Sequence, residues 1–305
     1  MSLTGKNIFL DERARNDIDA QVNKVLRGLG YPEPPLRLED VRLLLALDKR
    51  YYSSTDDGPL QEYVSKIKIA GKQVLQRPHL ILEAVRKFDL KALYLPDQKR
   101  ILIDQDLPQP KQRWNEAHEY THSVIPWHAH LTLGDDQQTL SLFCHEQIEH
   151  EANYAAGRLL FLQGKFDAMA GQSDMTIKLA QQLSKLFSNS LTTTLWRLVE
   201  LHHSPAVGLI GCHPQRLQEG TAAIRYFVTS RTFQQRFSNI SGPTVMEGVK
   251  SYCGYSTRGP LGASEILLDD DNGETHSFEF ETFYNQYDAL TLGIYKGKKS
   301  ILIAA

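Results

Sequence analysis

Residues Ala117-His118-Glu119-Tyr120-Thr121-His122 form an H-E-x-x-H stretch within a segment, Lys111 to Val124, whose pattern predicts an α-helix. An α-helix advances about 100° per residue, so His118 and His122 are expected one turn apart on the same face. Two imidazoles at this spacing can bind one Zn²⁺, and Glu119 would then lie beside the metal, where it can accept a proton from water. The stretch therefore predicts a zinc site that needs a third protein ligand from elsewhere in the chain.

The composition is that of a soluble globular protein. The 305 residues are 41% hydrophobic and 23% charged, which fits two domains or one catalytic domain with additions. The net charge of −2 argues against direct nucleic-acid binding and against an acidic membrane as partner. No apolar run predicts a membrane span or a signal peptide, and the three cysteines form no CxxC pair. These features predict a cytoplasmic protein with reduced thiols.

The third ligand is expected from the helix predicted over His145 to Leu162. Glu149 lies on the same side of this helix as Ala152 and Ala156, so it is expected to point toward the helix that carries the two histidines. Glu151 lies about 200° round from Glu149 and is expected to face solvent. Asn153, one turn beyond Glu149, is placed to bond the free ring N–H of a ligating histidine, although a simple polar contact is an equal alternative.

A second histidine pair on the same helix imitates the signature. His145 and His150 are five residues apart, which places them about 140° apart around the helix. That spacing cannot hold one ion from a regular helix, so this pair is not expected to bind metal.

The remaining pattern predicts an α+β fold in three parts. Helices are expected over 10–29, 38–47 and 78–88, with a loop over 51–58. Strands are expected over 92–95 and 100–104 on either side of a turn at 96–99, and two short helices over 177–187 and 191–201 have a helix-turn-helix outline. Strand-like runs then follow at 222–228, 264–268, 276–280 and 289–295. The parts are residues 1–165, 170–203 and 206–305, with a boundary near 203–205.

The run Glu149-His150-Glu151-Ala152-Asn153-Tyr154-Ala155-Ala156-Gly157-Arg158-Leu159-Leu160 resembles a motif of the ImmA/IrrE family of zinc metallo-endopeptidases. In that family an H-E-x-x-H signature is followed by E-x-x-A-x-x-F-A-x-x-L-L, and the first Glu of this motif is the third ligand. The resemblance covers roughly residues 75–203. Ala155 replaces the aromatic residue of the family motif, and Phe161-Leu162 replaces its usual Met-Pro, both of which are packing changes.

The resemblance implies a zincin-like metallopeptidase domain in which His118, His122 and Glu149 hold Zn²⁺ and Glu119 is the catalytic base. It implies that the substrate is a regulatory protein, typically a helix-turn-helix transcriptional repressor that is cleaved in a stress or mobile-element response. In one branch of the family a GAF-like sensor domain follows, and the β-rich part from residue 206 is a candidate for it.

Several roles stay open at this point. The strand Ile101-Leu102-Ile103 is expected to supply the sheet edge on which a substrate peptide pairs. The group that stabilises the oxyanion is one of Tyr120, His128, His202, His203 and Tyr226. Residues 177–201 have few basic side chains, which favours a packing or docking unit over a DNA reader. The oligomeric state is left open.

A second function class is a non-catalytic regulatory module that binds a repressor or a small ligand and uses the metal structurally. Glu119 argues against it, because a structural metal site has no use for a general base.

Overall fold

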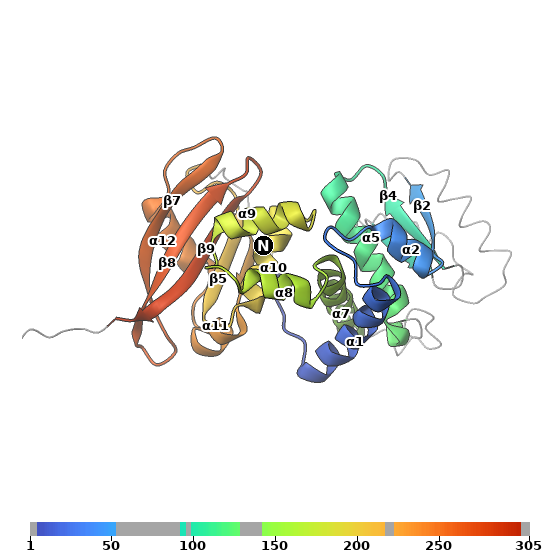
Figure 1. Cartoon of the computed structure of the whole chain (residues 1–305). Coiled ribbons are helices and arrows are strands. Elements are labelled where there is room, and N and C mark those ends of the chain that lie inside the picture. The colour runs from blue at the N-terminus through green and yellow to red at the C-terminus, as the bar shows by residue number, and fades with distance from the viewer. Residues whose placement is uncertain (1–4, 53–91, 96–98, 129–141, 217–222, 300–305) are drawn as a thin grey trace, which may run out of the picture. The chain divides into compact units, whose positions relative to one another are not determined.

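The computed structural model describes residues 5–52, 92–95, 99–128, 142–216 and 223–299. The chain forms two compact units, one from Leu10 to Lys165 and one that joins Met1–Phe9 to Phe166–Ala305 (Figure 1). Within the described ranges no helix combines the length and the apolar character that crossing a bilayer requires.

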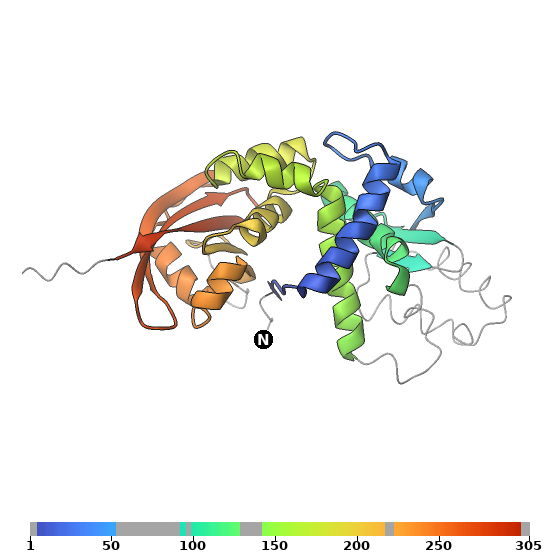
Figure 2. The same cartoon turned by 60° about the horizontal axis from the view of Figure 1, so that its bottom comes forward.

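Four helices lie in the described part of the unit from Leu10 to Lys165. They are α1 (Glu12–Gly28), α2 (Leu38–Leu44), α5 (Gln109–Val124) and α7 (Leu142–Leu160). The Asp11 side chain caps α1 by accepting a hydrogen bond from the Ala14 amide. Helix α7 packs against both α5 and α1 (Figure 2). Ala152, Ala155 and Ala156 on α7 are fully buried, and such small side chains let helices approach closely.

A three-stranded sheet completes this unit. It consists of β2 (Asp48–Tyr52), β3 (Ala92–Leu95) and β4 (Arg100–Asp104) in the order β2-β4-β3. Strand β4 pairs in parallel with β2 and antiparallel with β3, and α5 packs against β3 and β4. The sheet thus supports the helix that carries the H-E-x-x-H stretch.

The second unit contains a six-stranded sheet in the order β1-β6-β5-β9-β8-β7. Its pairs are antiparallel except β1 with β6. The strands are β1 (Gly5–Lys6), β5 (Ala206–Gly211), β6 (Ile224–Thr229), β7 (Gly259–Asp269), β8 (Thr275–Tyr284) and β9 (Ala289–Lys298). All six residues of β5 are buried, which is expected of a strand that is covered on both faces.

Helices cover both faces of this sheet (Figure 2). They are α9 (Ile177–Leu186), α10 (Leu191–Leu201), α11 (Arg231–Arg236) and α12 (Gly242–Tyr252). Helix α8 (Gly164–Ala170) packs its Phe166 ring against Phe187 at the end of α9. Val207 and Leu209 of β5 join a core cluster with residues of α11 and α12. Gly208, between them in the strand, instead faces Val199 of α10. The sheet is therefore the middle of three layers.

The mixed fold and the antiparallel C-terminal sheet confirm the coarse prediction, with differences in detail. The predicted helix over 38–47 ends at Leu44, and the first residues of the predicted loop at 51–58 belong to β2. Helices α8, α11 and α12 and strands β1, β2 and β5 were not predicted. Residues 170–203 share a compact unit with the sheet, while their helix-turn-helix assignment and the GAF-like assignment stay predictions. The predicted helix at 78–88 and most of the turn at 96–99 lie outside the described residues.

Candidate metal centre

Helix α5 presents its two histidines on one face. It begins after Pro108, with a second proline in its first turn, and ends at Val124 before Pro126. The i,i+4 spacing stacks His118 and His122 with ring centroids 4.8 Å apart, and their Nε2 atoms are 3.2 Å apart. Both Nε2 atoms are thus directed to the same point in space.

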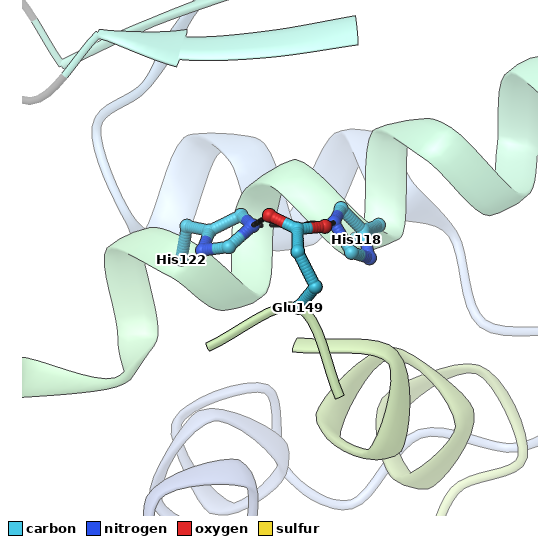
Figure 3. A group of neighbouring side chains, drawn as sticks. All are labelled: His118, His122 and Glu149. Carbon is cyan, nitrogen blue, oxygen red and sulfur yellow. Dashed lines mark hydrogen bonds and ion pairs between the residues drawn. The ribbon is translucent and has the colours of Figure 1, made fainter. Parts of the chain in front are cut away.

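Glu149 reaches this point from α7 (Figure 3). Its Oε2 is 3.2 Å from His118 Nε2, and its Oε1 is 3.8 Å from His122 Nε2. The side chains of His118 and His122 are 13% and 9% exposed, whereas that of Glu149 is 41% exposed. The cluster is therefore buried on the histidine side and open to solvent on the carboxylate side.

The donor set fits zinc. One atom from each of the three side chains lies within 4.8 Å of the others. Two imidazole nitrogens and one carboxylate are the ligands of a class of catalytic zinc sites, in which a fourth position is left for water or substrate. The solvent-facing side at Glu149 is compatible with that fourth position.

Glu119 lies between the two histidines in sequence and is itself buried. Burial alone would lower the pKa of His118, but the hydrogen bond to Glu149 and the charge of Glu119 outweigh it and raise this pKa above its usual value. The two carboxylates therefore give the cluster a negative electrostatic environment that favours a cation.

The ring nitrogens that face away from the cluster are also occupied. His118 Nδ1 is 3.1 Å from Asn153 Oδ1, and His122 Nδ1 is 3.0 Å from His128 Nδ1. The structure thus brings Asn153 to the expected ring nitrogen. His128 is predicted as one of the candidate oxyanion donors. Helical spacing does not predict its contact with His122, because α5 ends at Val124, between the two histidines.

The prediction that Glu151 faces solvent is wrong. Glu151 is buried, and it accepts hydrogen bonds from Trp127, His128 and Gln147. The helical turn at Pro126–His128 covers the side of α7 opposite Glu149, so α7 is buried on two sides. Burial raises the pKa of Glu151, but its three hydrogen-bond donors outweigh this effect and lower the pKa below its usual value.

The predicted edge position of Ile101-Leu102-Ile103 is also wrong. These residues lie in β4, which is the central strand of its sheet, with β2 on one side and β3 on the other. The backbone of a central strand is already paired on both sides and cannot take a further strand. Within the described residues, β2 and β3 are the edges of this sheet.

Two of the five candidate oxyanion donors lie near the cluster with their polar atoms engaged. Tyr120 is buried and its hydroxyl donates to Glu116, and both ring nitrogens of His128 have partners. Burial and the neighbouring Glu116 raise the pKa of Tyr120 far above its usual value, so its phenol keeps its proton. The other candidates, His202, His203 and Tyr226, belong to the second compact unit.

A second group of potential ligands occurs in the other unit, at the turn between β7 and β8. Asp270, Glu274 and His276 place one donor atom each within 4.8 Å of one another. The Arg236 guanidinium already bonds both Asp270 and His276, at 3.3 Å and 2.9 Å. Since a cation occupies this group, it is a structural ion-pair network and not a second candidate metal site.

Comparisons with known proteins identify one family and one similar fold. The family model of the IrrE N-terminal-like domain, a peptidase M78 domain, matches residues 76–199, which include His118, His122 and Glu149. A solved structure of a Mycobacterium tuberculosis transcriptional regulator is similar over 93% of this chain and 90% of that chain, with a TM-score of 0.51 and 13% sequence identity. At that identity the likeness shows a shared fold alone. No curated protein matches the sequence. Residues 76–199 thus match the IrrE N-terminal-like domain, in agreement with the resemblance of this segment to the ImmA/IrrE family.

Proposed function

We propose that this chain is a zinc-dependent endopeptidase of the cytoplasm that cleaves a regulatory protein. The observation that carries the proposal is the convergence of His118 Nε2, His122 Nε2 and the Glu149 carboxylate next to the buried Glu119. A structural zinc site is closed by its ligands, whereas this cluster has a solvent-exposed side.

In the proposed mechanism, His118, His122 and Glu149 hold the metal. Bound zinc would lower the pKa of a water molecule and polarise the scissile carbonyl. Glu119 accepts the proton of the attacking water and delivers it to the leaving amine as the peptide bond breaks. Its burial keeps this carboxylate fixed and its charge little screened. Asn153 holds the ring of His118 through Nδ1.

A peptide substrate is expected to pair with β3. This strand runs antiparallel to β4, packs against α5 and has one unpaired side within the described part of its sheet. Addition of a substrate strand at such an edge would satisfy the peptide backbone and extend it along the helix that carries Glu119. The match of residues 76–199 to the IrrE N-terminal-like domain supports a repressor of the helix-turn-helix type as the substrate, cleaved in a stress or mobile-element response.

The test compares zinc content and cleavage in the wild type, Glu119→Gln and His150→Ala, using as substrates the repressors encoded beside this gene. We expect one zinc per chain in all three proteins, cleavage by the wild type and by His150→Ala, and none by Glu119→Gln. His150 is the matched control because it adjoins Glu149 on α7 and lies outside the cluster.

Three outcomes overturn the proposal in different ways. Wild-type protein that binds no zinc would exclude the site. Undiminished cleavage by Glu119→Gln would exclude the mechanism. Stoichiometric zinc with no cleavage by the wild type, together with unfolding on chelation, would favour the non-catalytic module with a structural metal.

A further inference from the structure

A buried row of polar side chains leads away from His122. His122 Nδ1 is 3.0 Å from His128 Nδ1, and His128 Nε2 is 3.0 Å from Glu151 Oε2. Trp127 Nε1 donates to the same Glu151 oxygen at 2.6 Å, and Gln147 donates to the other oxygen at 3.0 Å. The carboxylate at the end of the row is thus held by three donors from two sides.

This row is built into the protein interior. His128 is 1% exposed and Glu151 is 4% exposed. A buried carboxylate is costly unless its hydrogen bonds are made, so such a group in a small core needs a specific partner. The partner of His118 is different, because Asn153 is a neutral amide that is exposed to solvent.

The row also determines which ring nitrogens carry hydrogen. Glu151 accepts, so the hydrogen of a neutral His128 lies on Nε2 and its Nδ1 is an acceptor. The contact between the two Nδ1 atoms then requires the hydrogen on His122 Nδ1. The lone pair of a neutral His122 then lies on Nε2, the atom that faces His118 and Glu149.

We propose that His128 and Glu151 are positioning residues that fix His122 in the Nδ1–H tautomer and hold its Nε2 lone pair toward the metal. This inference rests on the proposed metal site but not on the peptidase reaction. Partners of this kind set ring orientation and ligand basicity, and their loss typically costs about 10- to 100-fold in metal affinity.

The experiment measures two quantities, the zinc affinity against a competing chelator and the His122 tautomer from ¹⁵N chemical shifts of the metal-free protein. We expect the Nδ1–H tautomer in the wild type and an affinity loss of about 10- to 100-fold in His128→Leu. His128→Gln carries both an acceptor oxygen and a donor amide, so it should recover most of the affinity. Glu151→Gln is the milder variant should His128→Leu fail to fold, and it should weaken zinc binding in the same direction.

Trp127→Phe is the matched control, because it removes one hydrogen bond to Glu151 and leaves the contact between His128 and His122. It should lower the stability without changing the zinc affinity. If the row had only a structural role, the variants His128→Leu and Trp127→Phe would bind zinc with equal affinity. That result, or a predominant Nε2–H tautomer of His122 in the wild type, would overturn the inference while leaving the zinc site intact. A wild type that binds no zinc would overturn the site itself.

Discussion

The ion pair between Lys49 and Glu116 ties the metal-site helix α5 to strand β2. Lys49 Nζ is 2.9 Å from Glu116 Oε1, and the two side chains are only 19% and 10% exposed. The Tyr120 hydroxyl donates to the same oxygen. Burial lowers the pKa of Lys49, but the bond to Glu116 outweighs it and raises this pKa above its usual value, so Lys49 is a cation at neutral pH.

Substitution of Lys49 by Met removes the cation and leaves the Glu116 carboxylate largely buried. Breaking one side of a buried pair costs about 3–5 kcal/mol of the free energy of unfolding. Tyr120 still donates to Glu116 and the site keeps some contact with water, so we expect about 3 kcal/mol, at the low end of this range. The double variant Lys49→Met/Glu116→Gln has no uncompensated charge, and it should recover to within about 1 kcal/mol of the wild type.

The assay is urea unfolding followed by tryptophan fluorescence in a Trp196→Phe background. This background leaves Trp114 and Trp127, which both lie in the unit from Leu10 to Lys165, so the signal reports that unit alone. A loss below about 0.5 kcal/mol in Lys49→Met would refute the reasoning, since that is the size of an ordinary surface substitution. A double variant no more stable than Lys49→Met would refute it as well.

Three further predictions concern other positions. Gly293→Ala places a methyl group against the buried Phe280 ring and 2.8 Å from Val207 Cγ1. It should therefore lower the free energy of unfolding, measured by calorimetry or denaturation, by about 1–3 kcal/mol. Phe280→Leu in the same chain should restore part of this loss. Burial opposes the ionisation of Asp270, but backbone amides, His276 and Arg236 lower its pKa to about 2. The stabilising effect of the ionised Asp270 is therefore complete above its unfolded pKa of about 3.9 and is lost as the pH falls toward about 2. The difference in Tm between the wild type and Asp270→Asn should shrink over that interval. A difference in Tm that stays constant would contradict the prediction. Glu149→Gln should weaken zinc binding by more than about 100-fold in a chelator competition, since losing a ligand costs more than losing the partner of a ligand, and near-normal affinity would exclude Glu149 as a ligand.

The features that depend on local spacing could be predicted from the sequence. The i,i+4 histidines share a face in any regular helix, and Glu149 was identified because Ala152 and Ala156 lie on its side of α7. The same reasoning failed for Glu151. It assumed that α7 buries a single face, whereas the turn that follows α5 covers a second one with Trp127 and His128.

The features that depend on pairing between distant segments could not be predicted. The sequence predicts a loop from residue 51 and no element over residues 48–50. Residues 48–52 nevertheless form β2 through parallel pairing with β4, whose residues are some fifty positions away. This pairing places Ile101 and Ile103 in the centre of the sheet and moves its edge to β3. Helix α11 is six residues long and was hidden among strand-like runs, because so short a helix has little periodicity of its own.

The most direct test of the central claim is zinc K-edge X-ray absorption of the purified protein. The proposed site predicts two imidazole nitrogens at about 2.0–2.1 Å and the remaining ligands oxygen, with Glu149→Gln changing the oxygen shell and leaving the imidazole signal. Sulfur ligands at about 2.3 Å, or fewer than two imidazoles, would contradict a centre made by His118, His122 and Glu149.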